Sequence, residues 1–184
     1  MSLDKRKTYC HFVQNLPKDD INRQYHDTQY GFKIDSDNEL FGRLILEINQ
    51  AGLSWTTILK KSHNIKAAFS NYNIVEIANY NDENVKKLLS NSGIIRNKLK
   101  IHAIIFNAKK IITLQSEYGS FNKWLIHHRS LSLEGWIKLF KTTFKFTGKE
   151  ITKEFLLSTG FIEGAHVDYC PIYKITHLNN HFEF

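Results

Sequence analysis

The pattern of hydrophobic and polar positions is helical along most of the chain. Between Leu40 and Ile48, apolar residues recur at spacings of three and four, and strict apolar–polar alternation is scarce elsewhere. Only two prolines and nine glycines interrupt the 184 residues. The pattern predicts an all-α protein with helices over residues 37–50, 55–69, 74–79, 82–90, 96–117, 121–128, 133–140 and 149–158.

Local signals mark several ends of these helices. Side chains suited to cap a helix start are found at Ser54, Asn73 and Asn81. Glycines suited to end a helix are found at Gly119 and Gly160. The segment before Asp35 is rich in aromatic and hydrogen-bonding side chains and lacks clear periodicity, so we predict that it is irregular.

The end of the first strongly apolar helix gathers polar chemistry. Residues 47–55 read Glu-Ile-Asn-Gln-Ala-Gly-Leu-Ser-Trp, so a carboxylate, two amides and an indole follow one another around a break at Gly52. Such a set can line a pocket for a flat polar ligand. The alternative is an ordinary helix end, with Glu47 in solvent and Trp55 in the core.

Residues 82–112 read as two helices joined by the turn Ser-Gly-Ile-Ile-Arg-Asn-Lys. Gly93 permits a sharp bend or a close approach to a ligand, and Ile94 is apolar enough to anchor the turn. Free backbone N–H groups at the second helix start, beside Arg96 and Lys98, favour a phosphate. These are features of a helix-hairpin-helix that grips the DNA backbone, although an ordinary helix connection with solvated basic residues fits equally.

Charge and composition narrow the class of protein. The formal net charge is +7 and the pI is about 9.3, which favours a polyanionic partner such as nucleic acid. The first residues lack the apolar core of a secretory signal, and no apolar run approaches the roughly 20 residues of a membrane span. We therefore expect a cytoplasmic protein with no membrane partner. Without a repeat or an obvious linker, residues 1–184 are expected to form one domain.

The cysteines and several histidines suggest a metal site. His166 precedes Cys170 by four residues, which puts both side chains on one face of a helix or tight turn. Cys10 and His26 offer two more ligands, completing the closed tetrahedral set typical of structural zinc and tying residues 9–31 to residues 160–172. A chance pairing is the alternative, because other histidines compete as ligands: His11, His102, His127 and His128.

Several of these motifs together resemble DNA-3-methyladenine glycosylase I, the constitutive bacterial glycosylase. The shared motifs, in the order of the family, are residues 25–27 with Gly31, 47–55, 59–61, 92–96, 100–108, 144–148, and His166 with Cys170. The resemblance covers about residues 9–171. It implies the all-helical helix-hairpin-helix glycosylase fold, with that motif at about residues 82–112.

The resemblance also implies an activity and a site. The reaction is hydrolysis of the bond between deoxyribose and 3-methyladenine in alkylated double-stranded DNA, with free 3-methyladenine as a product and 3-methylguanine as a further candidate substrate. Glu47 takes the catalytic position and hydrogen-bonds the flipped base, with further base-binding positions at Tyr25, Trp55, Tyr30, Phe12 and Asn49. The implied DNA contacts are Gly93, Ile94, Arg96 and Lys98. The implied zinc is structural, held by Cys10, His26, His166 and Cys170.

The implied chemistry is consistent with the residues present. A 3-methylated adenine is cationic, so its face suits an indole, its edge suits a carboxylate, and it leaves readily without a strong general acid. Between residues 82 and 115 the only aspartate is Asp82, so no aspartate follows the hairpin.

Asn22 and Gln29 depart from the family pattern. They leave open a DNA-binding protein with weakened excision, and a catalytic zinc hydrolase with an open metal position is a third interpretation. We expect a monomer.

Overall fold

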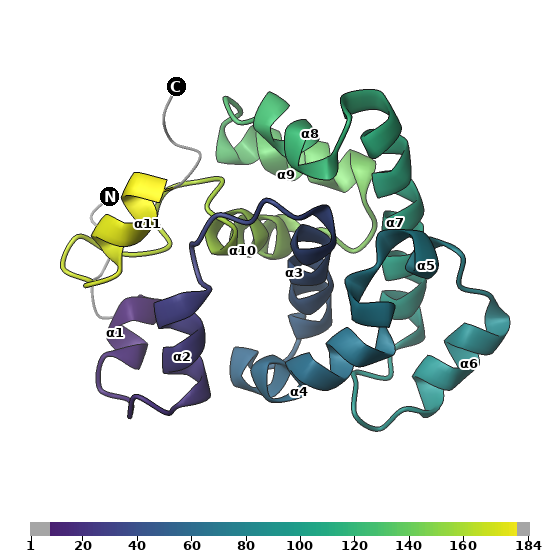
Figure 1. Ribbon diagram of the computed structural model, residues 1–184, viewed down its shortest axis with the longest axis horizontal. Coiled ribbons are helices and arrows are strands. Elements are labelled where there is room, and N and C mark those ends of the chain that lie inside the picture. Colours follow the sequence, from purple (N-terminus) through teal and green to yellow (C-terminus); the bar gives the residue numbers. More distant parts are fainter. Residues whose placement is uncertain (1–7, 180–184) are drawn as a thin grey trace. The chain divides into compact units, whose positions relative to one another are not determined.

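The computed structural model describes residues 8–179, and within that range it contains helices and turns but no strand (Figure 1). The all-α prediction is confirmed. The helices are α1 Tyr9–Val13, α2 Ile21–Thr28, α3 Asp37–Gln50, α4 Trp55–Ala68, the short η2 Ser70–Tyr72, α5 Ile74–Ala78, α6 Asp82–Ser90, α7 Lys98–Tyr118, α8 Phe121–His127, α9 Leu133–Thr143, α10 Lys149–Ser158 and α11 Tyr173–Asn179.

The predicted helix starts are confirmed where a side chain caps them. The side chains of Ser54, Asn73 and Asn81 each accept a hydrogen bond from a backbone N–H in the first turn that follows. The long helix α7 begins at Lys98 rather than at residue 96, because the Asn97 side chain caps it by accepting the Lys100 backbone N–H at 3.1 Å. Gly119 ends α7 in the left-handed conformation, with φ of 88°.

The prediction of an irregular N-terminal segment is wrong. Residues before Asp35 form α1, capped by the Thr8 side chain, and α2, capped by Asp20. The buried face of α2 consists of Asn22, Tyr25 and His26, which are polar or amphipathic rather than aliphatic. Ile21 is the only aliphatic residue of α2, so the helix lacks the run of apolar residues that marks α3.

The chain divides into two compact units. Unit 1 combines Met1–Ile34 with Leu156–Phe184, and unit 2 is Asp35–Phe155. Unit 1 contains α1, α2 and α11, and the backbone N–H of Gly31 donates to the Ser158 carbonyl at 3.0 Å, joining its two segments. The expectation of one domain over residues 1–184 stays a prediction.

Unit 2 is built around α3, α7 and an aromatic cluster. One face of α3 is fully buried at Leu40, Phe41, Leu44, Ile45 and Ile48. Contacts link α3 to α4, α7 and α8, and α7 to α5 and α6. The aromatic cluster, in which the centroids of neighbouring rings lie at most 6.4 Å apart, comprises Phe121, Trp124, Trp136, Phe140, Phe144 and Phe155. The helix α3, which carries Glu47, is thus held in the core of unit 2.

Two contacts hold the flanks of α3. A Cβ added at Gly42 would lie 2.2 Å from the Tyr72 ring, so the ring lies directly on the backbone of α3. Tyr72 reaches this position from a turn in which Ser70, Asn71 and Tyr72 all have positive φ, an unusual conformation for residues other than glycine. At the helix start, the Asp37 carboxylate accepts the backbone N–H groups of Phe121 and Asn122 at 2.8 and 2.9 Å.

No helix within residues 8–179 combines the length and the apolar character needed to cross a membrane.

Candidate functional site

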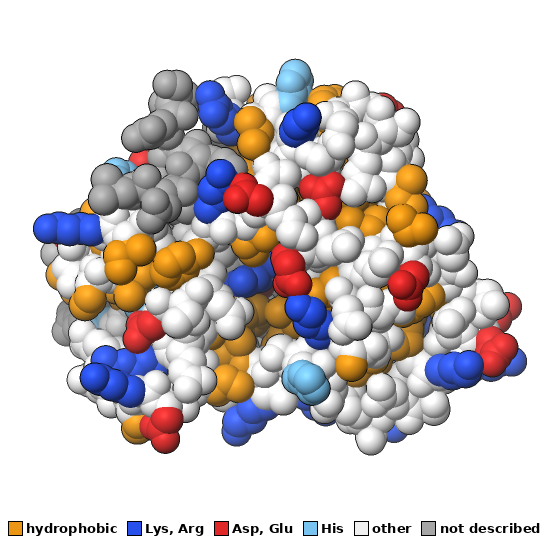
Figure 2. Space-filling model, viewed as in Figure 1, with side chains coloured by type: hydrophobic (Ala, Val, Ile, Leu, Met, Phe, Trp, Pro, Cys, Tyr) orange, Lys and Arg blue, Asp and Glu red, His pale blue; other side chains and the backbone are white. Residues whose placement is uncertain are grey.

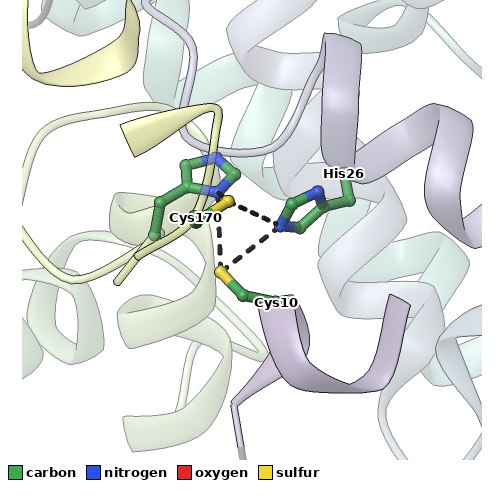
Figure 3. A group of neighbouring side chains, drawn as sticks. Cys10, His26 and Cys170 are labelled. Carbon is green, nitrogen blue, oxygen red and sulfur yellow. Dashed lines mark hydrogen bonds between the residues drawn. The ribbon is translucent and has the colours of Figure 1, made fainter. Parts of the chain in front are cut away.

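Cys10, His26, His166 and Cys170 converge in unit 1, as the spacing predicts. Their ligand atoms all lie within 4.8 Å of one another, and all four residues are buried. Cys10 comes from α1 and His26 from α2, while His166 and Cys170 flank a turn before α11. Figure 3 shows the two sulfur atoms and the His26 ring nitrogen facing one another. The group could bind one metal ion.

The four distances between a sulfur and a ring nitrogen match those of a tetrahedral centre. The distances from Cys10 Sγ to His26 Nε2 and His166 Nδ1 are 3.3 and 3.7 Å. The distances from Cys170 Sγ to the same two nitrogens are 3.7 and 3.5 Å. Bonds of about 2.3 Å to sulfur and about 2.05 Å to nitrogen place these atoms about 3.6 Å apart in a tetrahedral zinc site.

The outer ring nitrogens of both histidines have acceptors, so the inner nitrogens are the ones that face the sulfur atoms. His26 Nδ1 donates to the Asp27 carboxylate at 2.8 Å, and His166 Nε2 donates to the Tyr30 backbone carbonyl at 2.7 Å. A neutral ring therefore carries its hydrogen on the outside and turns a lone pair toward the cysteines, whereas a protonated ring also donates to them. Metal-binding histidines are usually oriented in this way.

The two thiols are not equivalent. The hydrogen bond donated by the Cys10 thiol, with others from His166 and His26, lowers the pKa of Cys170 against the opposing effect of burial. The same hydrogen bond and burial raise the pKa of Cys10. Burial opposes the charged form of His26, but the hydrogen bonds and charges of Cys170 and Asp27 together outweigh it and raise the pKa of His26. A thiol with a lowered pKa suits a cation, because the thiolate is the form that binds a metal.

The predicted aromatic contacts of unit 1 form one cluster beside these ligands. Tyr25 and Tyr30 are buried with ring centroids 5.9 Å apart, and the Tyr30 ring also packs on His166 at 5.7 Å. Phe12 is 52% exposed, and its ring stacks on that of Tyr9 with the centroids 6.0 Å apart. Tyr9, which sequence reasoning missed, is the centre of this cluster, with its ring 5.3 Å from that of Tyr30. Its position next to Cys10 was the only available signal.

The predicted residues of unit 2 lie around the turn between α3 and α4. Glu47 and Asn49 are buried near the end of α3, with 4% and 2% of their surface exposed. The Asn49 side-chain amide donates to the Ile45 carbonyl at 2.8 Å, so its nitrogen is engaged within the helix. Trp55 is half-buried at the first position of α4. The turn itself is closed by the Leu53 N–H bonding to the Gln50 carbonyl at 2.7 Å, with Gly52 at φ of 81°.

Lys100, the third residue of α7, also contacts this turn. Its side chain is buried, and Nζ donates to the backbone carbonyls of Asn49 at 2.8 Å and Ala51 at 2.7 Å. Burial lowers the pKa of this ammonium group. A lysine at a helix start gives no sequence signal that it points inward.

A turn joins α6 and α7 at the position predicted for the hairpin, and the assignment of a helix-hairpin-helix stays a prediction. Ile94 is buried, and Arg96 and Lys98 are exposed. Gly93 does not have a positive φ, and space around it is tight, because a Cβ there would lie 3.0 Å from Asn91 Oδ1 and 3.2 Å from Asn64 Nδ2. The Gly93 N–H already donates to Asn91 Oδ1 at 2.8 Å.

On the face drawn in Figure 2, blue basic side chains are dispersed and interspersed with red acidic ones. The net charge of +7 therefore does not gather into a single basic patch in this view.

Comparisons with known proteins agree on one family. The family model described as methyladenine glycosylase matches residues 15–136. DNA-3-methyladenine glycosylase 1 of Escherichia coli (strain K12) is 31% identical over 174 residues, covering 84% of this chain and 93% of that protein. The Haemophilus influenzae (strain ATCC 51907 / DSM 11121 / KW20 / Rd) DNA-3-methyladenine glycosylase is 29% identical over 166 residues, covering 80% of this chain and 89% of that protein.

Solved structures show the same relationship. A crystal structure of 3-methyladenine DNA glycosylase I superposes with a TM-score of 0.77 at 30% identity, covering 86% of this chain and 97% of the other. A tyrosine-to-phenylalanine variant of such an enzyme, in complex with 3-methyladenine, superposes with a TM-score of 0.79 at 27% identity, covering 89% and 96%. The chain belongs to the methyladenine glycosylase family, and it is accordingly a glycosylase that acts on N-glycosyl bonds.

Proposed function

We propose that this protein is a base-excision repair enzyme that hydrolyses the N-glycosidic bond of 3-methyladenine in alkylated double-stranded DNA. The observation that carries the proposal is the buried carboxylate of Glu47 near the end of α3, followed by the half-buried indole of Trp55 at the start of α4. Relatives that share this chain's fold and nearly its whole length are named for the same base. 3-Methylguanine is a second candidate substrate.

The proposed recognition rests on the charge of the base. A 3-methylated adenine carries a positive charge, so a buried carboxylate such as Glu47 binds it more strongly than it binds neutral adenine. An aromatic face such as Trp55 attracts the same cation. Asn49 is a further proposed contact through its side-chain oxygen, since its nitrogen already donates to Ile45. Tyr25, Tyr30 and Phe12 are proposed as aromatic contacts on the strength of the family resemblance.

In the proposed mechanism the protein does not need to supply a strong general acid. A base within a duplex must be flipped out before its glycosidic bond can be reached. The cationic base then departs as neutral 3-methyladenine, so binding the cation in the geometry of bond cleavage supplies much of the rate enhancement. Water completes the hydrolysis at the sugar and leaves an abasic site.

DNA binding is assigned to the hairpin between α6 and α7. Exposed Arg96 and Lys98 stand at the start of a 21-residue helix, where the helix dipole also favours a phosphate. The N–H groups of Gly93 and Lys100 already have side-chain acceptors, so Gly93 contributes through close packing rather than through its own amide.

Because the proposed substrate is chromosomal DNA, we also propose that the enzyme acts in the bacterial cytoplasm, as a monomer.

The four-residue group in unit 1 is proposed to hold one structural zinc ion. The donor set of two thiolates and two imidazoles, the spacing near 3.6 Å and the bound outer nitrogens all fit zinc. When bound, the ion would fasten α1 and α2 to the segment before α11. All four donors converge on one point, which argues against the open coordination position that a catalytic zinc hydrolase needs.

The test is release of free 3-methyladenine from methylated duplex DNA, measured by chromatography. The wild-type protein is expected to release it, and Glu47→Gln is expected to reduce the single-turnover rate by at least about 100-fold. Glu39→Gln is the matched control, because Glu39 is an exposed carboxylate on the same helix that pairs with Lys66. Equal release by wild-type protein and Glu47→Gln would remove Glu47 from the mechanism.

A second candidate is a damaged-DNA-binding protein with weakened excision. The observation that favours it is Asn22, which occupies an expected aromatic position and is buried with its amide bonded to Asp20 at 3.1 Å. Tight, salt-dependent binding to abasic-site DNA without base release by the wild-type protein would establish this alternative.

A further inference from the structure

Lys100 is a buried cation that joins two segments of unit 2 far apart in sequence. It is the third residue of α7 and has 4% of its surface exposed. Its ammonium group donates to the carbonyl oxygens of Asn49 and Ala51 at 2.8 and 2.7 Å. The connection spans about 50 residues of sequence and links the helix after the hairpin to the turn after Glu47.

The two carbonyls are groups that need a donor. The last carbonyls of a helix have no partner within it, and here the chain leaves α3 at Gln50 and turns at Gly52. An ammonium group at this end also faces the negative pole of the α3 dipole. Lys100 thus closes the C-terminal end of α3 and fixes the path of the chain from Glu47 to Trp55.

A neighbouring loop covers the same ammonium group. The Phe146 ring centroid lies 5.9 Å from Lys100 Nζ, and Phe146 has a φ of 63°, a costly conformation for an aromatic residue. The fully buried side chain of Asn107 holds this loop with two hydrogen bonds to the Lys145 backbone, at 3.0 and 2.8 Å. Strain that is held by a buried anchor is typical of functional sites.

Burying an ammonium group costs free energy, so holding the turn alone is a weak reason for a lysine at this position. The cost becomes understandable if the geometry of the turn matters to the reaction. Lys98, a proposed phosphate contact, is only two residues before Lys100 on the same helix turn. A rigid link at Lys100 would therefore keep the base-binding turn in a fixed relation to the phosphate-binding hairpin.

We propose that Lys100 is a positioning residue, which holds the α3–α4 turn so that Glu47 and Trp55 present their side chains to the flipped base while the hairpin grips the DNA. This inference rests on the proposed function for the identity of the base. It assigns Lys100 no contact with the base or the phosphate. Lys100 affects the rate of the reaction only by holding the α3–α4 turn in place.

The experiment compares Lys100→Met with wild-type protein and with Ile111→Ala. Methionine keeps the length of the side chain and removes the donor. Ile111 is fully buried on α7, about 16 Å further along the helix, so Ile111→Ala lowers stability by about 2 to 5 kcal/mol without touching the turn. Three quantities are measured for each intact protein. The first is the rate of hydrogen exchange within residues 49–55 in the absence of DNA. The second is the affinity for DNA, and the third is the single-turnover rate of 3-methyladenine release.

Lys100→Met is expected to speed exchange in residues 49–55 and to slow base release by about 10- to 100-fold, with DNA affinity changed by less than about twofold. Ile111→Ala is expected to leave both the turn and the rate near wild-type values. Unchanged exchange in Lys100→Met would overturn the inference whatever the activity. So would a loss of rate no larger than that of Ile111→Ala. If the wild-type protein released no 3-methyladenine while exchange still responded to Lys100→Met, the proposed function would fail and the clamp on the turn would stand.

Discussion

His166 Nε2 lies 2.7 Å from the backbone carbonyl oxygen of Tyr30, while His166 Nδ1 faces Cys10 and Cys170. One imidazole thus connects the proposed metal centre directly to the backbone of an aromatic residue proposed to touch the base. The next residue, Gly31, packs closely against the same segment, since a Cβ at Gly31 would lie 2.7 Å from the Ala165 Cβ and 3.1 Å from the His166 ring. Loss of the metal would therefore disturb Tyr30 as well as the chain ends.

Replacing Cys170 with serine should abolish metal binding. Wild-type protein is expected to hold about one zinc ion per chain, and Cys170→Ser well under half of that, because serine does not supply a thiolate. The loss should cost about 2 kcal/mol or more of unfolding free energy, seen as a lower Tm that added zinc does not restore. Elemental analysis and thermal unfolding provide the measurements.

His11→Gln is the control for the metal prediction. His11 lies beside Cys10 in sequence, but its ring bonds to the Gln14 side chain at 2.8 Å. Full zinc content in His11→Gln with loss in Cys170→Ser is the expected result. Normal zinc content in Cys170→Ser would show that the four-residue group is not the metal centre.

Gly42→Ala should destabilise unit 2. The new methyl group would lie 2.2 Å from the Tyr72 ring, and the ring is held by a turn of three residues with positive φ. Overpacking of this kind costs about 1 to 3 kcal/mol. Urea denaturation measures the loss. Gly148→Ala is the control, because no atom lies within 4 Å of its added Cβ, and its unfolding midpoint should stay near that of wild-type protein.

Asp37→Ala should loosen the start of α8. The Asp37 carboxylate accepts the backbone N–H groups of Phe121 and Asn122 and the Gln115 side-chain amide at 2.7 Å. Hydrogen bonds to a charged group contribute about 1.5 to 3 kcal/mol, so a loss near 2 kcal/mol is expected in denaturant unfolding. Asp82→Ala removes an exposed acid from the first turn of α6 and should cost less than about 1 kcal/mol. Similar losses in the two variants would mean that Asp37 acts only through its charge.

Replacing Arg96 and Lys98 together with alanine should weaken DNA binding on every sequence. Each phosphate contact contributes about 0.9 to the slope of log K against log salt, so the slope should fall by about 2. The control pair is Lys138→Ala with Lys141→Ala, which removes the same charge from exposed positions on α9. An unchanged slope in the first variant would place the DNA-binding face elsewhere.

The sequence predicts much of this fold because a single capping residue marks the start of a helix. Ser54, Asn73 and Asn81 each accept a backbone N–H as expected, and the bounds of α3, α6 and α10 are those of the periodic pattern. The convergence of Cys10, His26, His166 and Cys170 is also predictable, since few residue types can bind zinc and their spacing is restricted.

The remainder depends on contacts between distant residues. The helix α2 buries Asn22 and His26, and α11 buries Thr176, so polar residues take buried positions that a pattern of apolar residues does not mark. The inward turn of Lys100 depends on two carbonyls about 50 residues away, and the need for glycine at position 42 depends on where Tyr72 lies. No local pattern encodes such partners.

The two halves of this group of cysteines and histidines are separated by most of the chain, since Cys170 comes 144 positions after His26. During synthesis from the N-terminus, Cys10 and His26 leave the ribosome long before their partners exist. Unit 2 lies wholly between them and can fold first. A ribosome that stalls before residue 166 therefore releases a chain in which Cys10 and His26 lack their two partners, so assembly of this group would mark a chain synthesised past residue 170.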